Sequence, residues 1–302
     1  MIQKIDRALL PLLLELNDLK RVRVADREGT LATQIFRRAW AELLHGDELA
    51  AVARRTTAHA VAAARLAGID AHVMQLAGFS AEQRLAVLHH SFDVVAGPLP
   101  EAARVEMRAA LVGEPLEGPP SGSLPAFAEL LVRQPRAGAT RPGHQRVVLE
   151  PAEGHGDHCA TVAVYAVLWS PLLGADPALP FLAGLAHHLH NARLPDAGFA
   201  GDELLGDQLG PLMERFRQMA IEELPERMHA PVRAALDLVF RQDTPEARAF
   251  QAADVCDRVL EMRWHAQSAA FTLDVALDEM DVVHPGPVQA FQLEVMRGLG
   301  LM

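Results

Sequence analysis

The residues best suited to chemistry are histidines and aspartates, gathered in three short strings of the second half of the chain. The strings are GHGDHC (residues 154–159), LAHHLHNARLPD (185–196) and AADVCDRV (252–259). Neutral imidazole together with carboxylate suits a hard or borderline divalent ion such as Mn, Fe, Zn, Ni or Co. The strings therefore predict a divalent metal site.

Helical spacing sorts the histidines of the middle string. On a helix His187, His190 and Asn191 share one face, while His188 points about 100° away. A metal ion near the end of that helix could still draw in both neighbours. In the last string Asp254 and Asp257 share a helical face, and this spacing alone also allows the two to be solvated carboxylates paired with arginines, Arg258 or Arg248.

In their order along the chain, the strings resemble the HD-domain superfamily of metal-dependent phosphohydrolases. In that family a His opens one helix, a His-Asp pair ends the next, and an Asp lies on a later helix. HHLHNARLPD and ADVCDRV are similar to strings of the HD-GYP proteins, and DTPEARAFQAADVCDRVLEM (243–262) resembles a stretch of the HD nucleotidases. The resemblance covers roughly residues 150–265.

The resemblance implies a set of metal ligands, which are His158, His187, His188 and Asp254. His188 stands where the family has the Asp of its pair, so the ligand present is neutral rather than charged. No H-x-G-Y-P string follows. We therefore do not expect cyclic dinucleotide hydrolysis.

The activity implied is metal-assisted hydrolysis of a nucleotide or another small phosphoester. His190 or Asp196 would orient the attacking water or protonate the leaving oxygen, and Arg193 would bind phosphate. Two alternatives stay open. One is a degenerate HD scaffold that binds metal, nucleotide or a protein partner without turnover, and the other is a di-iron oxidative enzyme on the same helical frame.

Helix-forming residues at helical spacing run through nearly every long segment, so we expect an all-α fold with an additional N-terminal helical region. The resemblance implies that the rest is a multi-helix, HD-domain-like bundle. Pro- and Gly-rich stretches at residues 114–125 and 134–145 suggest two parts. These are residues 1–140, of unknown role, and residues 145–302, the HD-like metal-binding part. The apolar stretch at residues 159–175 reads as a buried core helix rather than a membrane span.

Few residues of the N-terminal part have a type and spacing that indicate a catalytic or metal site. Its Ala-rich, amphipathic helices suggest a dimerisation or sensing module. His89 and His90, with Asp93, allow a second metal-like site or, more simply, a polar cluster on a helix face.

The composition of the chain limits the classes of molecule that it is expected to bind. The 302 residues carry a net charge of −11, and 14 of them are histidine. An acidic chain makes nucleic acid an unlikely main partner. The two cysteines lie 97 positions apart, which fits a reducing, cytoplasmic setting without a disulfide framework. We expect a small phosphorylated substrate or nucleotide as partner, no nucleic acid, no membrane, and a possible homodimer.

Overall fold

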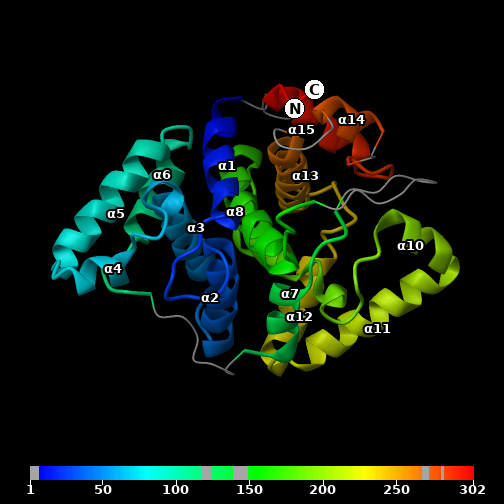
Figure 1. Cartoon of the computed structure of the whole chain (residues 1–302), viewed down its shortest axis with the longest axis horizontal. Coiled ribbons are helices and arrows are strands. Elements are labelled where there is room, and N and C mark those ends of the chain that lie inside the picture. Colours follow the sequence, from blue (N-terminus) through cyan, green and yellow to red (C-terminus); the bar gives the residue numbers. More distant parts are fainter. Residues whose placement is uncertain (1–6, 117–123, 139–148, 267–271, 280–281) are drawn as a thin grey trace.

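The chain is built of helices joined by loops (Figure 1). The computed structural model describes residues 7–116, 124–138, 149–266, 272–279 and 282–302. These residues contain no β-strand, and their one isolated bridge joins Pro135 to Gly154. The all-α prediction is confirmed.

The first part of the chain contributes helices of modest length. They are η1 (Arg7–Leu9), α1 (Leu10–Asn17), η2 (Asp18–Lys20), α2 (Leu31–His45), α3 (Leu49–Leu66), α4 (Ala71–Leu76), α5 (Ala81–Val95), α6 (Glu101–Ala109) and α7 (Ala126–Arg133). Side chains fix several of their starts. Thr30 caps α2 by accepting a hydrogen bond from the backbone of Thr33, and Ser80 forms a capping box with Gln83 on α5.

The second part holds the longest helices. They are α8 (His155–Leu173), α9 (Ala178–Ala186), η3 (Leu189–Ala192), α10 (Gly198–Leu205), η4 (Gly206–Gln208), α11 (Leu209–Glu222), α12 (Glu226–Leu236), α13 (Pro245–Ala266), α14 (Leu273–Asp278) and α15 (Gln289–Leu299). The apolar stretch at residues 159–175 lies largely within α8, which is buried along most of its length. Among the described residues, no helix combines the length and apolarity needed to cross a membrane.

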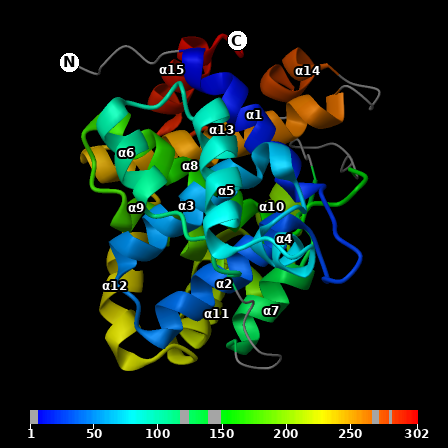
Figure 2. The ribbon, with the colours of Figure 1, turned by 90° about the vertical axis from the view of Figure 1, so that its left-hand side faces the viewer.

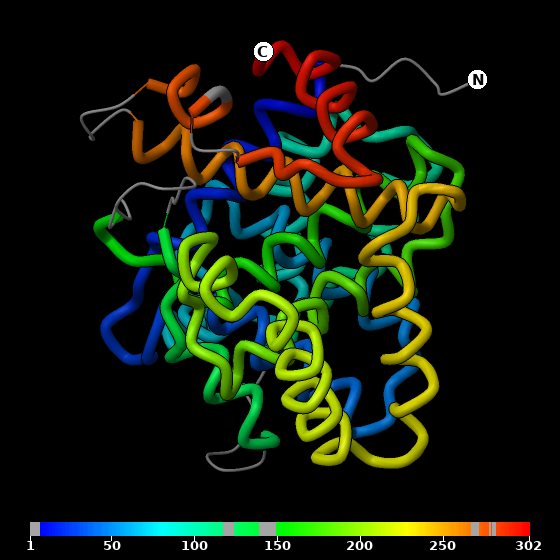
Figure 3. The backbone as a smooth tube through the Cα atoms, turned by 90° about the vertical axis from the view of Figure 1, so that its right-hand side faces the viewer, coloured from blue at the N-terminus to red at the C-terminus, as the bar shows by residue number. Residues whose placement is uncertain are grey.

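Helix α8 occupies the centre of the molecule. It packs against α13 and α9 from its own part of the chain and against α2 and α3 from the first part. Figure 2 shows α5 and α6 outside α3, and Figure 3 shows α10 and α11 on the opposite side. Gly184 permits the close contact of α9 with α8, because a Cβ there would lie 2.4 Å from the Cα of Ala163.

One hydrophobic core runs through both parts of the chain. It joins Trp40 and Phe127, whose rings meet edge to face at 5.1 Å, to residues of the later helices such as Tyr165 and Phe250. The predicted boundary between residues 140 and 145 lies outside the described residues. The division at that point stays a prediction, and the described helices of both parts share their core.

Candidate metal centre

The turn after α9 brings two neighbouring histidines to one place. The middle string was predicted to be helical through Asn191, but α9 ends at Ala186. His188 leaves the helix with φ −103° and ψ 20°, and the short η3 follows. The assumed 100° separation of His187 and His188 therefore does not hold, and their rings lie 4.2 Å apart between centroids.

Three of the predicted ligands lie close together beside this turn. His158, in the first turn of α8, places its Nε2 3.0 Å from Nε2 of His187. One ligand atom from each of His158, His187 and His188 lies within 4.8 Å of the other two. Asp254, on α13, completes the set, with Oδ1 3.6 Å from His158 Nε2 and 3.9 Å from His187 Nε2. All four predicted ligands lie together.

Hydrogen bonds to the other ring nitrogens fix which nitrogen of each histidine is bare. His158 Nδ1 lies 2.6 Å from Oδ2 of Asp257, a fully buried carboxylate, and donates to it. His187 Nδ1 donates to the carbonyl oxygen of Gly184 at 2.9 Å. With the proton on Nδ1, each Nε2 keeps its lone pair.

His188 is fixed in the same way by an amide. Its Nδ1 donates to Oδ1 of Asn191 at 2.8 Å. Asn191 is oriented in turn, because its Nδ2 donates to the carbonyl oxygen of Leu194 at 3.1 Å. Metal-binding histidines characteristically donate the second ring N–H to a carboxylate, carbonyl or amide oxygen. All three histidines meet that requirement.

The resulting geometry fits a cation. Two bare nitrogens that face each other at 3.0 Å, His158 Nε2 and His187 Nε2, have no proton to share and repel each other. A divalent ion accepts both lone pairs and removes the repulsion. Three imidazoles and the Asp254 carboxylate form a donor set suited to Zn, Co, Fe, Mn or Ni.

The protonation states agree with this donor set. Burial lowers the pKa of His187 to about 4 and carries the pKa values of His158 and His188 well below the ordinary value. Burial alone would raise the pKa of Asp254, but the charge of the neighbouring Arg258 brings it below its usual value. Neutral imidazoles and an ionised carboxylate are the forms that bind metal.

A buried charge network supports His158 from behind. Lys20 Nζ, from η2, lies 2.5 Å from Oδ1 of Asp257 and also contacts Glu153. Arg136 Nη1 donates to Glu153 at 2.9 Å and lies 3.0 Å from His158 Nδ1. Burial, together with the nearby carboxylates of Glu153 and Glu261, raises the pKa of Asp257, whereas the charge and hydrogen bond of Lys20 favour its carboxylate form. Glu153, His158 and Asp257 also have metal-like spacing, but Lys20 and Arg136 already occupy that position.

Two of the predicted catalytic residues lie near the histidines. His190 is buried, its ring centroid lies 5.7 Å from that of His188, and its Nδ1 has no hydrogen-bond partner. Burial lowers the pKa of His190 to about 3. Asp196 accepts hydrogen bonds from the backbone N–H groups of Ala137 and Gly198, at 2.9 and 3.0 Å. Each carboxylate oxygen of Asp196 therefore accepts a hydrogen bond from the backbone.

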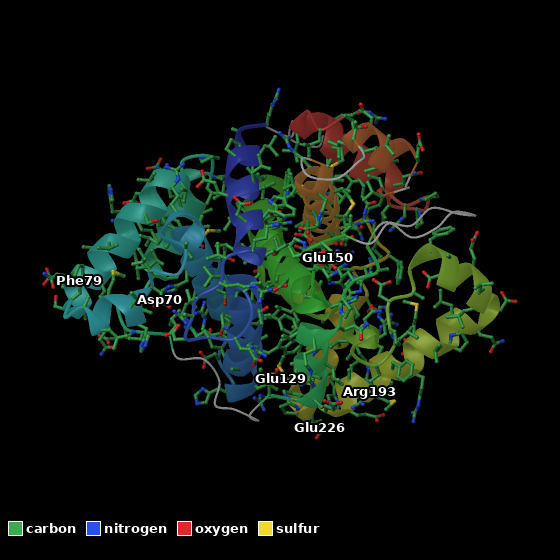
Figure 4. All side chains as sticks on the ribbon, in the orientation of Figure 1. Asp70, Phe79, Glu129, Glu150, Arg193 and Glu226 are labelled. Carbon is green, nitrogen blue, oxygen red and sulfur yellow. The ribbon has the colours of Figure 1, made fainter. Side chains whose placement is uncertain are left out.

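Arg193, the predicted phosphate ligand, is engaged elsewhere. Its guanidinium pairs with Glu223 at 2.9 Å, and Figure 4 shows it beside α11. Its role as a phosphate ligand stays a prediction.

The structure places one further histidine, His155, beside the predicted ligands. His155 is fully buried and donates Nδ1–H to the carbonyl oxygen of Gln134 at 3.1 Å, so its Nε2 is bare. That Nε2 has no hydrogen-bond partner and lies 3.7 Å from Oδ2 of Asp196. The ring centroid of His155 is 4.9 Å from that of His188. Its position three residues before His158, one helical turn away, was the available signal.

The paired histidines of the first part behave differently. His89 Nε2 lies 3.2 Å from the carbonyl oxygen of Arg108, whose guanidinium binds Asp93 at 2.9 Å. His90 is exposed on α5. In the described part of the chain, the groups with metal-ligand spacing include neither histidine. The polar-cluster reading fits these contacts.

Comparison with protein-family models, with curated proteins and with solved structures finds no match. The functional argument therefore rests on the geometry of the centre.

Proposed function

We propose that this chain is a metal-dependent phosphohydrolase that acts on a nucleotide or another small phosphoester. The observation that carries the proposal is the meeting of three bare imidazole nitrogens with one carboxylate, from His158, His187, His188 and Asp254. His158 on α8, His187 and His188 directly after α9, and Asp254 on α13 follow one another in the order that the HD-domain resemblance implies.

The four residues would hold one divalent ion. Such an ion supplies Lewis-acid chemistry, because it makes water acidic enough to attack near neutral pH and draws charge from a phosphoryl oxygen. The protein contributes the rigidity of the site. Asp257, Gly184 and Asn191 hold the three imidazoles in fixed orientations, so the donors are arranged before the ion arrives.

Charge favours an anionic substrate. The carboxylates in the ligand set and its contact network are Glu153, Asp254, Asp257 and Glu261, and the cations that contact them are Lys20, Arg21, Arg136 and Arg258. The four negative and four positive formal charges cancel. A divalent ion bound to neutral imidazoles then makes the centre positive, which attracts a phosphate group.

Proton transfer has two candidate groups beside the ligands. His155 Nε2 is bare and unpartnered, and the Asp196 carboxylate lies 3.7 Å from it. This pair can accept a proton from the attacking water. His190 Nδ1 is also unpartnered and buried, and this neutral imidazole can orient the attacking water.

A second candidate is a metal-binding scaffold without turnover. His188 favours it, since a neutral imidazole replaces the charged ligand that the HD-domain resemblance implies. A di-iron oxidative enzyme is the third, favoured by the additional bare nitrogen of His155 next to the ligand set.

Metal analysis of the purified chain is the first experiment. The proposal expects about one bound divalent ion per chain and hydrolysis of an aryl phosphate or of a nucleotide in a panel. His187→Ala removes both properties. His90→Ala, a histidine exposed on α5, is the matched control and keeps them.

The outcomes separate the three candidates. A chain that binds no metal, and whose melting temperature does not rise with Mn or Co, contradicts both enzyme proposals. Bound metal without hydrolysis, together with turnover gained by His188→Asp, favours the scaffold. A near-ultraviolet iron-oxo band that bleaches on reduction favours the oxidative enzyme.

A further inference from the structure

A second candidate site lies in the first part of the chain, away from α9 and α13. A cavity of about 70 Å³ opens between α2, α3, α4 and α5. Asp70, which lines it, lies at the left of Figure 4 beside α4, whereas Arg193 lies on the right. Most of the lining is apolar, with Leu31, Ile35 and Leu88 among its walls.

One cation in this lining lacks a close partner. The guanidinium of Arg38 has its nearest carboxylate, Glu42, at 4.0 Å, and its Nε is buried without a hydrogen bond. Glu42 is committed to Arg55, at 2.8 Å. A buried donor without a partner destabilises the fold, so Arg38 is a group that an incoming acceptor would satisfy.

The other polar side chains of the cavity each have at least one partner. Arg27 Nη1 binds Asp70 at 2.5 Å, although its Nη2 is buried without a partner. His59 Nε2 accepts a hydrogen bond from the backbone N–H of Val112, which keeps that imidazole nitrogen unprotonated. Among the charged residues that line the cavity, two arginines therefore face one aspartate. The lining has room for one more negative charge.

Backbone strain marks the same place. Ala67 lines the cavity and adopts φ 49°, and it is the one residue other than glycine with positive φ in the described part of the chain. Such conformations persist where the surroundings hold them, and they cluster at ligand sites.

We propose that this cavity binds a small monoanionic carboxylate, with Arg38 pairing its carboxylate and the apolar walls packing on its chain. Size limits the ligand, since a cavity of about 150 Å³ accepts a benzene ring. A volume of about 70 Å³ suits a smaller molecule, a carboxylate of about two carbons such as acetate. The site would make the first part of the chain a sensing module and does not depend on the metal centre.

Acetate titrated into the full chain is the test. The melting temperature and the ring signals of His59 in NMR are the two readouts. We expect saturable changes with acetate, and none with acetamide, which has the same shape without the charge. Arg38→Gln weakens binding at least ten-fold. Arg54→Gln, which removes an arginine of α3 paired with Glu106, is the matched control and binds acetate like the wild type.

A second variant keeps the test valid if Arg38→Gln does not fold. Ala63 also lines the cavity, and Ala63→Leu fills the space while leaving the arginines in place. We expect it to abolish the response to acetate. The proposal is overturned by the absence of a saturable change, by an equal response to acetamide, or by binding that survives Ala63→Leu. A response to inorganic phosphate alone would also overturn it.

Discussion

Asp257 should set the metal affinity of the centre without being a ligand. Its Oδ2 lies 2.6 Å from His158 Nδ1 and its Oδ1 lies 2.5 Å from Lys20 Nζ. In Asp257→Asn one side of the carboxylate becomes an NH₂ group, which faces one of these two donors. The anion that holds the proton on His158 Nδ1 and makes Nε2 a better donor is lost in either orientation.

Loss of such a partner typically weakens metal binding by about 10–100-fold, or about 1.4–2.7 kcal/mol. For 302 residues the entropy of unfolding near the melting point is about 0.6 kcal/mol per degree. At a fixed excess of metal, the metal-induced rise in melting temperature should therefore shrink by about 2–4 °C relative to the wild type.

Calorimetric melting with and without Co(II) is the assay, together with a direct titration of Co(II) absorption. Each variant is compared with its own metal-free form, because breaking a buried pair also lowers the stability of the metal-free protein. Asp243→Asn, an exposed carboxylate paired with Arg241, is the control and should change neither quantity. Unchanged Co(II) affinity in Asp257→Asn would refute the reasoning.

Two further predictions concern stability. Gly184→Ala places a Cβ 2.4 Å from the Cα of Ala163 and should lower the free energy of unfolding by about 1–3 kcal/mol in chemical denaturation. Gly97→Ala is the control and should have little effect, because its Cβ meets nothing within 4 Å. Equal losses of stability in the two variants would contradict the close contact of α9 with α8. Burial lowers the pKa of His59 to about 3, so between about pH 3 and 6.5 only the unfolded state protonates it and stability falls as pH falls. In urea denaturation at a series of pH values, His59→Gln should reduce the slope of the unfolding free energy against pH by about 1.4 kcal/mol per pH unit. An unchanged slope would show that His59 is not the group responsible for the loss of stability.

The ligands could be predicted because they lie near the ends of helices or on them, where type and spacing are informative. His158 opens α8, and Asp254 lies on a long helix whose register is regular. The end of α9 could not be predicted from periodicity. The break at His188 is a local change of two dihedral angles, and it brings the His188 ring to 4.2 Å from that of His187, between centroids.

The buried charge network behind His158 was harder to predict than the ligands, because its residues come from distant segments of the chain. Asp257 was considered as an exposed partner of Arg258 or Arg248, yet it contacts His158 and Lys20, and Arg258 pairs with Asp254 instead. Lys20 is 237 positions from Asp257, and linear spacing carries no signal over that separation. Only the packing of the N-terminal helices on α8 and α13 brings the two together.

X-ray absorption spectroscopy of the Co(II)- or Zn(II)-loaded chain tests the central claim most directly. Three imidazole nitrogens at about 2.0–2.1 Å with one carboxylate oxygen are expected, and His188→Ala should remove one imidazole from the spectrum. A loaded wild-type chain whose metal has fewer than three imidazole ligands, or the same ligands after His188→Ala, would contradict the account.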